Sequence, residues 1–159
     1  MLVFINIGTN LGDRRRNLSR AVVAIAARFG TFEVSHAVES APMGFDSSNK
    51  FLNIAMVFRS EESSLDILHA LQEIERDLGD RLARENAARF VPDAATDSAI
   101  HDTHRTSEGK YKDRFLDIDI MTIEGVEMQS DELTLPHPRL RERPFFMEPL
   151  QELLSQIPQ

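Results

Sequence analysis

The chain has 159 residues, no cysteine and a formal net charge of −8, and 42% of its residues are hydrophobic. This length predicts a single domain over residues 1–159, while the composition excludes a disordered chain, a disulfide framework and a thiol nucleophile. The acidic charge argues against a nucleic-acid partner, and no apolar run is long enough for a signal peptide or membrane span, which predicts a cytoplasmic protein.

The first part of the chain predicts three strands and one helix. Residues 2–8 are rich in Val, Phe and Ile, which is typical of a strand. A helix is expected between Asp13 and Gly30, because apolar residues recur there at helical spacing. A second strand, which ends at an Ala-Pro-Met-Gly break, and a third strand are expected over residues 32–38 and 51–58.

The second part predicts two helices around a further strand. One helix is expected to begin at Ser63 or Ser64 and to end at Gly79. The strand, a hairpin turn into a short partner strand, and the final helix are expected over residues 115–123, 124–128 and 144–154. The order is βαββαβ followed by a hairpin strand and a helix, which predicts an α+β fold with a ferredoxin-like core.

Residues 80–113 do not match any expected element. This stretch is polar and far longer than the ~12–15 residues beyond which structureless loops become uncommon in compact domains. Long loops of this kind are often lids or disordered insertions. We therefore expect a long lid-like loop at about 80–113, with a plain disordered insertion as the alternative.

Asp117 and Asp119 form a carboxylate pair within the expected strand 115–123. Leu116, Ile118 and Ile120 take the buried phase, so the two aspartates share the other face with Cα atoms about 6.6–7 Å apart. Carboxylates so placed repel one another unless a cation lies between them, and Mg²⁺ binds one or two carboxylates together with substrate phosphates. For an isolated pair, a solvated strand face is the alternative.

Two further features are candidates for ligand binding. Residues 137–143 hold three arginines and a histidine, and guanidinium groups bind phosphate oxygens in a bidentate manner. Asn53 is the strongly polar side chain on one face of the expected third strand, where an amide offers a donor and an acceptor to a flat heterocycle. A basic surface turn and a bond to neighbouring backbone are the respective alternatives.

Six segments, taken together, resemble the 6-hydroxymethyl-7,8-dihydropterin pyrophosphokinase family of folate biosynthesis. They occur in the family's order and cover residues 7–13, 41–44, 51–53, 74–79, 113–120 and 135–145. The resemblance implies transfer of the β,γ-pyrophosphoryl unit of ATP to the pterin hydroxymethyl oxygen, which gives the pterin diphosphate and AMP. It departs from the family in some twenty extra residues before Tyr111, which stands where the family has a tryptophan.

We expect a monomer. The resemblance also implies roles for individual residues. Two Mg²⁺ ions would be bound by Asp117 and Asp119. ATP would be surrounded by Gln72, Glu75, Arg84, Arg114, Ile120, Thr134, His137, Arg139 and Arg143. The pterin would lie against Pro42, Met43, Phe51, Asn53, Tyr111 and Phe145. Catalysis would depend on Asp117, Asp119, Arg84, Arg114 and Arg143, although Arg81 or Arg89 could serve in place of Arg84.

Two other functions remain open from the residues alone. One is a non-catalytic ferredoxin-like domain that binds a small ligand. The other is a paralogue that keeps the pocket but acts on a different hydroxymethylated heterocycle. Mg²⁺-dependent ATP binding would separate the first alternative from an enzyme.

Overall fold

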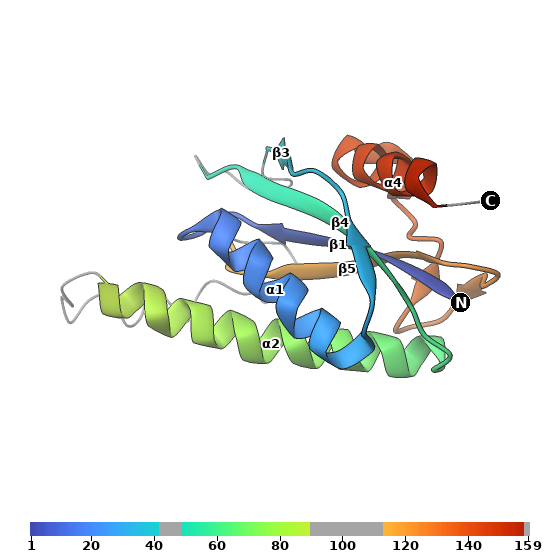
Figure 1. Cartoon of the computed structure of the whole chain (residues 1–159), viewed down its shortest axis with the longest axis horizontal. Coiled ribbons are helices and arrows are strands. Elements are labelled where there is room, and N and C mark those ends of the chain that lie inside the picture. Colours follow the sequence, from blue (N-terminus) through green and yellow to red (C-terminus); the bar gives the residue numbers. More distant parts are fainter. Residues whose placement is uncertain (42–48, 90–112, 158–159) are drawn as a thin grey trace.

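The computed structural model of the chain describes residues 1–41, 49–89 and 113–157. A twisted antiparallel sheet lies at its centre, with the helices α1 and α2 on one face and α4 on the other (Figure 1). No helix in the described ranges is long and apolar enough to cross a membrane.

The sheet has the strand order of a ferredoxin-like fold. Its strands are β1 (Leu2–Thr9), β2 (Phe32–Val34), β3 (Val38–Ser40), β4 (Phe51–Arg59) and β5 (Asp117–Ile123). The order is β2-β4-β1-β5, β3 also pairs with β4, and every pairing is antiparallel. Strands β1 and β4 are therefore central, and both are buried along nearly their whole length. The predicted α+β, ferredoxin-like fold is confirmed.

Both faces of the sheet are covered by helices. The helix α1 (Arg14–Phe29) begins at Asp13, whose carboxylate accepts a hydrogen bond from the Arg16 N–H at 3.1 Å. The helices α1 and α2 (Ser64–Arg89) bury their apolar stripes on one face of the sheet, in the larger core. A smaller core on the opposite face joins the sheet to α4 (Pro144–Gln156).

The predicted end of the second helix at Gly79 is wrong, because α2 continues for ten residues to Arg89. Leu82 and Ala83 are buried in the larger core, so the apolar stripe continues past the glycine. Gly79 is itself buried within the helix. Burial of this stripe outweighs the roughly 1 kcal/mol that glycine costs in a helix interior. The first part of the expected loop 80–113 is thus helical, and residues 90–112 lie outside the described residues.

The predicted strand 32–38 is also interrupted. Its two parts, β2 and β3, pair with β4 on either side of Ser35. The Ser35 hydroxyl accepts a hydrogen bond from the Ala55 N–H at 2.9 Å, while its own N–H donates to the Ala55 carbonyl at 3.0 Å. A side-chain oxygen thus takes the place of a backbone acceptor, which breaks the strand at this position.

The turn at Glu124–Gly125 exists, but the strand after it has a different partner from the expected one. Gly125 has φ +75°, which favours glycine. The following strand β6 (Met128–Gln129) pairs with β7 (Thr134–Leu135) in a separate two-stranded sheet rather than with β5. A short 3₁₀ helix, η1 (Leu140–Glu142), then leads into α4.

Candidate active site

The carboxylates of Asp117 and Asp119 lie on the α4-facing side of β5, at the meeting point of two cavities. The residues between and after them, Ile118 and Ile120, are buried in the core with α1 and α2. On β1, Gly8 pairs with Asp117 and Asn6 pairs with Asp119. The pair therefore lies beside a central strand, close to the start of α4.

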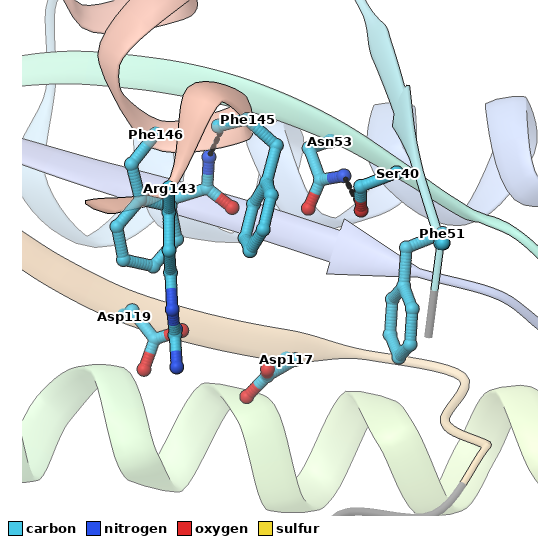
Figure 2. A pocket seen from close by; sticks show the side chains of 10 residues that line it. Ser40, Phe51, Asn53, Asp117, Asp119, Arg143, Phe145 and Phe146 are labelled. Carbon is cyan, nitrogen blue, oxygen red and sulfur yellow. Dashed lines mark hydrogen bonds between the residues drawn. The ribbon is translucent and has the colours of Figure 1, made fainter. Parts of the chain in front are cut away.

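The first cavity lies between the sheet and the first turn of α4. Figure 2 shows the rings of Phe51 and Phe145 on two sides of it, with Asn53 between them and the carboxylates below. Its lining residues are Asn6, Ser40, Ala41, Phe51, Asn53, Asp117, Asp119, Arg143, Phe145 and Phe146. Two aromatic rings and one amide suit a flat, hydrogen-bonding heterocycle.

The amide of Asn53 is held in one orientation by strand β3. Its Nδ2 donates to the Ser40 hydroxyl at 2.9 Å and to the Val38 carbonyl at 3.3 Å (Figure 2 shows the Ser40 bond). Both amide hydrogens are thus used. Because Asn53 is only 3% exposed and its Nδ2 is bonded to β3, its Oδ1 is a hydrogen-bond acceptor in a fixed position at the first cavity.

Asp117 is paired with a buried arginine. The Arg114 Nη1 donates to Asp117 Oδ1 at 2.9 Å, and the Arg114 side chain is 7% exposed. Asn10 fixes the backbone of Arg114 from both directions: its Oδ1 accepts the Arg114 N–H at 2.6 Å, and its own N–H donates to the Arg114 carbonyl at 3.0 Å. The Nδ2 of Asn10 also bonds the Asp113 carboxylate at 2.7 Å.

Asp119 lies in a more negative environment. Burial raises the pKa of its carboxyl well above the usual range, and the nearby carboxylates of Asp117 and Glu75 raise it further. The positive charges of Arg143 and Arg114 act in the opposite direction and only partly offset this. A site that holds carboxylates against their own repulsion is suited to a cation.

The two aspartates fit the donor set that Mg²⁺ prefers. Hard carboxylate oxygens face the place where the two cavities join. Within the described residues, no group of three or more His, Cys, Asp or Glu side chains forms a complete metal site. A metal ion here would therefore need oxygen atoms from a substrate as well, which is how Mg²⁺ commonly binds beside phosphates.

The second cavity is a polar groove between α2, β5 and the β6–β7 turn, and it shares Asp117 and Asp119 with the first. The groove is lined by six of the expected ATP-binding residues, namely Gln72, Glu75, Arg114, Ile120, Thr134 and His137. The Oε2 of Glu75 accepts the Ile118 N–H at 3.1 Å, which ties α2 to the aspartate strand. Two binding spaces thus meet at one carboxylate pair.

His137 is held as a neutral ring beside this groove. Its Nδ1 accepts the Arg139 N–H at 3.1 Å, and its ring contacts Phe146 edge-on at 5.1 Å between centroids. Burial, followed by the charges of Arg143 and Arg139, lowers the pKa of His137 to about 4. The imidazole therefore carries its hydrogen on Nε2 and can donate it to an anionic ligand.

The expected arginines differ in their placement. Arg143 lines the first cavity, and its guanidinium lies 5.1 Å from the Phe146 ring centroid and 5.6 Å from that of Phe145. Arg139 and Arg84 are exposed, and within the described part of the chain they line neither cavity. Arg81, an alternative to Arg84, is likewise exposed on α2, and the position of Arg89 ends that helix.

Three expected residues are not described by the structure, and three other residues near the site were not expected. Pro42, Met43 and Tyr111 lie outside the described residues, so their expected roles stay predictions. Sequence reasoning missed Asn6, Gly8 and Ser40. The one signal for Asn6 in the sequence was a polar amide within the otherwise apolar run of residues 2–7.

The sequence is similar to those of known proteins. A sequence model of the 7,8-dihydro-6-hydroxymethylpterin-pyrophosphokinase family matches residues 4–93 and 94–155. A 2-amino-4-hydroxy-6-hydroxymethyldihydropteridine pyrophosphokinase from Porphyromonas gingivalis is 36% identical over 155 residues, which cover 96% of this chain and 90% of the relative. The enzyme of the same name from Bacillus subtilis is 28% identical, over 98% of this chain and 80% of the relative.

A plant relative carries the same region within a longer protein. The mitochondrial folate synthesis bifunctional protein of Pisum sativum is 32% identical over 96% of this chain but only 25% of the relative. Since the family match extends over nearly all of the sequence, the chain belongs to the 7,8-dihydro-6-hydroxymethylpterin-pyrophosphokinase family.

Proposed function

We propose that this protein transfers the pyrophosphoryl group of ATP to 6-hydroxymethyl-7,8-dihydropterin in tetrahydrofolate biosynthesis. As a family member it is an ATP-dependent pyrophosphokinase. The structural observation that carries the proposal is the junction of an aromatic cavity and a polar groove at Asp117 and Asp119. Such a junction supports the binding of a flat acceptor and a polyphosphate donor beside the same carboxylates.

The aromatic cavity is the proposed pterin site. Phe51 and Phe145 would enclose the ring system, and the Oδ1 of Asn53 would accept a hydrogen bond from an N–H group on its edge. The hydroxymethyl group would then point toward the carboxylates, where Asp119 accepts the hydrogen bond of its O–H. This orientation places the acceptor oxygen beside the groove.

The polar groove is the proposed ATP site. We propose that Asp117 and Asp119 hold two Mg²⁺ ions, which supply the positive charge that a triphosphate requires during transfer. Arg114 and Arg143 add charge-assisted hydrogen bonds to the phosphates, and neutral His137 adds a donor. Gln72, Glu75, Ile120 and Thr134 would complete the groove, with Arg84 and Arg139 approaching from its exposed side.

The reaction itself exchanges one bond to phosphorus for another. The hydroxymethyl oxygen loses its proton, which passes to solvent, and forms a bond to the β-phosphorus, while the bond between that phosphorus and the bridging oxygen of AMP breaks. The side chains around the junction would hold the attacking oxygen and the leaving oxygen in line. Catalysis by positioning and charge is the usual pattern for phosphoryl transfer.

We also propose that residues 1–159 act as one domain, as a monomer in the cytoplasm, without a nucleic-acid or membrane partner. The acidic net charge supports the absence of a nucleic-acid partner. Neither a non-catalytic binding domain nor a paralogue for another heterocycle has a specific observation in its favour.

A coupled assay for AMP release tests the proposed function directly. The purified chain is incubated with ATP and Mg²⁺, with and without 6-hydroxymethyl-7,8-dihydropterin. We expect AMP release that depends on both the pterin and the metal. AMP release that is independent of the pterin, or none under any condition, would contradict the proposed function.

A further inference from the structure

Asn6 connects the middle of the sheet to the first turn of α4. Its Nδ2 donates to the backbone carbonyl of Phe145 at 2.9 Å, and the residue is only 3% exposed. The neighbours of Asn6 along β1, including Ile5 and Ile7, are buried and apolar. A buried amide at this position needs a partner, and the helix provides one.

The Phe145 carbonyl is available because of a proline inside α4. In an α-helix, the carbonyl of residue 145 would accept the N–H of residue 149, but position 149 is a proline and has no N–H. A carbonyl left without a donor in a buried place costs about 1–3 kcal/mol. The Asn6 amide supplies the hydrogen bond that Pro149 cannot.

This bond is placed where it affects the proposed pterin site. Asn6 pairs with Asp119 of β5 on one side and with Ala55 of β4 on the other, and it lines the first cavity itself. Phe145 lines the same cavity and directly follows Pro144 and Arg143. A single hydrogen bond therefore ties the start of α4 to the strand β1, which lies directly beside the carboxylate pair.

We propose that Asn6 is a positioning residue for pterin binding. By bonding the carbonyl that Pro149 leaves open, it holds the first turn of α4, and with it the ring of Phe145, at a set distance from the carboxylates. The proposal rests on the proposed function, since it assigns Asn6 to the pterin half of that site. Asn6 does not itself line the ATP groove, so we expect its main effect on the pterin.

Two replacements of Asn6 and one of Pro149 test this mechanism. Asn6→Leu keeps the branched shape of the side chain but removes the donor, and Asn6→Ala removes both the branch and the donor. Pro149→Ala restores an N–H that can bond the Phe145 carbonyl within the helix. Each single variant and the double variants with Pro149→Ala are compared for KM of both substrates. Pterin affinity is also measured by calorimetry with a non-hydrolysable ATP analogue and Mg²⁺.

We expect each Asn6 variant to raise KM and Kd for the pterin by about tenfold, the equivalent of 1.4 kcal/mol, and to change KM for ATP by less than about twofold. In the Pro149→Ala background, the same replacement should raise the pterin KM by less than about threefold. This rescue would show that the loss of affinity comes from the unpaired Phe145 carbonyl. A general packing defect around Asn6 would not be relieved by a new N–H group at position 149.

The proposal is overturned if pterin affinity is unchanged in the Asn6 variants, or if the loss is equally large in the Pro149→Ala background. If Asn6→Leu does not fold, Asn6→Ala and its double variant decide the question. A wild-type chain that binds the pterin but releases no AMP contradicts the proposed function alone, since binding still tests Asn6. A wild-type chain that does not bind the pterin overturns both.

Discussion

Gly8 of β1 and Asn53 of β4 lie opposite one another, and a Cβ atom on Gly8 would come within 2.9 Å of the Asn53 Oδ1. Asn53 has little freedom to move away, because its Nδ2 is bonded to Ser40 and to the Val38 carbonyl. The absence of a side chain at position 8 therefore keeps the Asn53 acceptor accessible on the floor of the aromatic cavity.

Replacing Gly8 with alanine should impair the pterin site selectively. In Gly8→Ala the new methyl group would displace the Asn53 oxygen or occupy the place of its ligand, so pterin affinity should fall by at least about tenfold. ATP affinity should change by less than about twofold, because the groove does not include residue 8. Calorimetric titration with each ligand measures both, and equal losses for the two would contradict the assignment.

Gly79→Ala is the matched control and a prediction in its own right. Gly79 lies inside α2, and a Cβ there would meet only the Leu116 Cβ, at 4.0 Å, which is an ordinary contact distance. Alanine should therefore stabilise the protein by about 0.5–1 kcal/mol without changing pterin affinity. Urea unfolding of both proteins tests this, and a destabilised variant would show that the helix cannot accept a methyl group here.

Gly79 also shows why the helix end could not be predicted locally. Helical periodicity before it and a polar stretch after it are typical of a C-terminal cap, and that pattern predicted a loop from residue 80. The helix continues because Leu82 and Ala83 are buried in the core, and such long-range packing cannot be recognised from the local sequence. The break at Ser35 is similar, because it depends on a hydroxyl bonding Ala55 across the sheet.

The candidate site was more predictable where strand alternation alone places a residue. The shared face of Asp117 and Asp119 follows from a period of two, and so does the cavity face of Asn53. Asn6 was not predictable in this way. Its role depends on Pro149, which lies 143 positions further along the chain in a helix, α4, that packs on the sheet.

The two aspartates should be equally necessary for turnover but should differ in their effect on stability. We expect Asp117→Asn and Asp119→Asn each to lower kcat by at least ~10²-fold, about 2.7 kcal/mol of barrier. Asp119→Asn should leave the ligand-free protein as stable or more stable, since it removes a crowded carboxylate. Asp117→Asn should cost about 1–3 kcal/mol, because the buried Arg114 loses its charged partner.

Denaturant unfolding without ligands, together with the AMP assay, separates these effects. A variant with near-normal turnover would remove that aspartate from the proposed metal site. Equal stability changes in the two variants would show instead that the ion pair between Arg114 and Asp117 stabilises the protein no more than a contact between Arg114 and a neutral amide. Magnesium-dependent ATP binding provides a third measurement that does not require catalysis.

His137 should make the protein less stable as the pH falls from 6.5 toward 4. The folded pKa is lowered to about 4 from the usual 6.5, so the unfolded chain binds a proton in this range while the folded chain does not. Stability from the neutral ring is thus fully present above pH 6.5. Between pH 7 and pH 4.5, the wild type should lose about 1–2 kcal/mol more than His137→Gln, after allowance for partial solvent screening.

Carboxylates also titrate in this range, but they are common to both proteins, so the difference between the two curves isolates His137. Unfolding free energies measured at four or five pH values would give that difference. Parallel curves for wild type and variant would mean that the imidazole is protonated as easily in the folded state as in the unfolded chain.

The last prediction contrasts two arginines that are only four positions apart. Arg143 lies at the carboxylate junction, with its guanidinium beside the rings of Phe145 and Phe146, and its Nε is buried without a hydrogen-bond partner among the described residues. Such a group is poised to bind an anion, and a charge-assisted bond of this kind is worth about 1.5–3 kcal/mol. Arg143→Ala should therefore lower kcat/KM for ATP by about 10–100-fold.

Arg139 provides the comparison, because it has the same charge on the same segment but is exposed, lines neither cavity of the described structure and is proposed to approach ATP only from the exposed side of the groove. Exposed charges contribute little, so Arg139→Ala should change kcat/KM for ATP by less than about threefold. Steady-state kinetics at saturating pterin measure both variants under one condition. Because both variants lose one positive charge, a change in net charge alone would affect them equally. Equal losses would thus assign the effect to the basic character of the segment and not to the position of Arg143 at the junction.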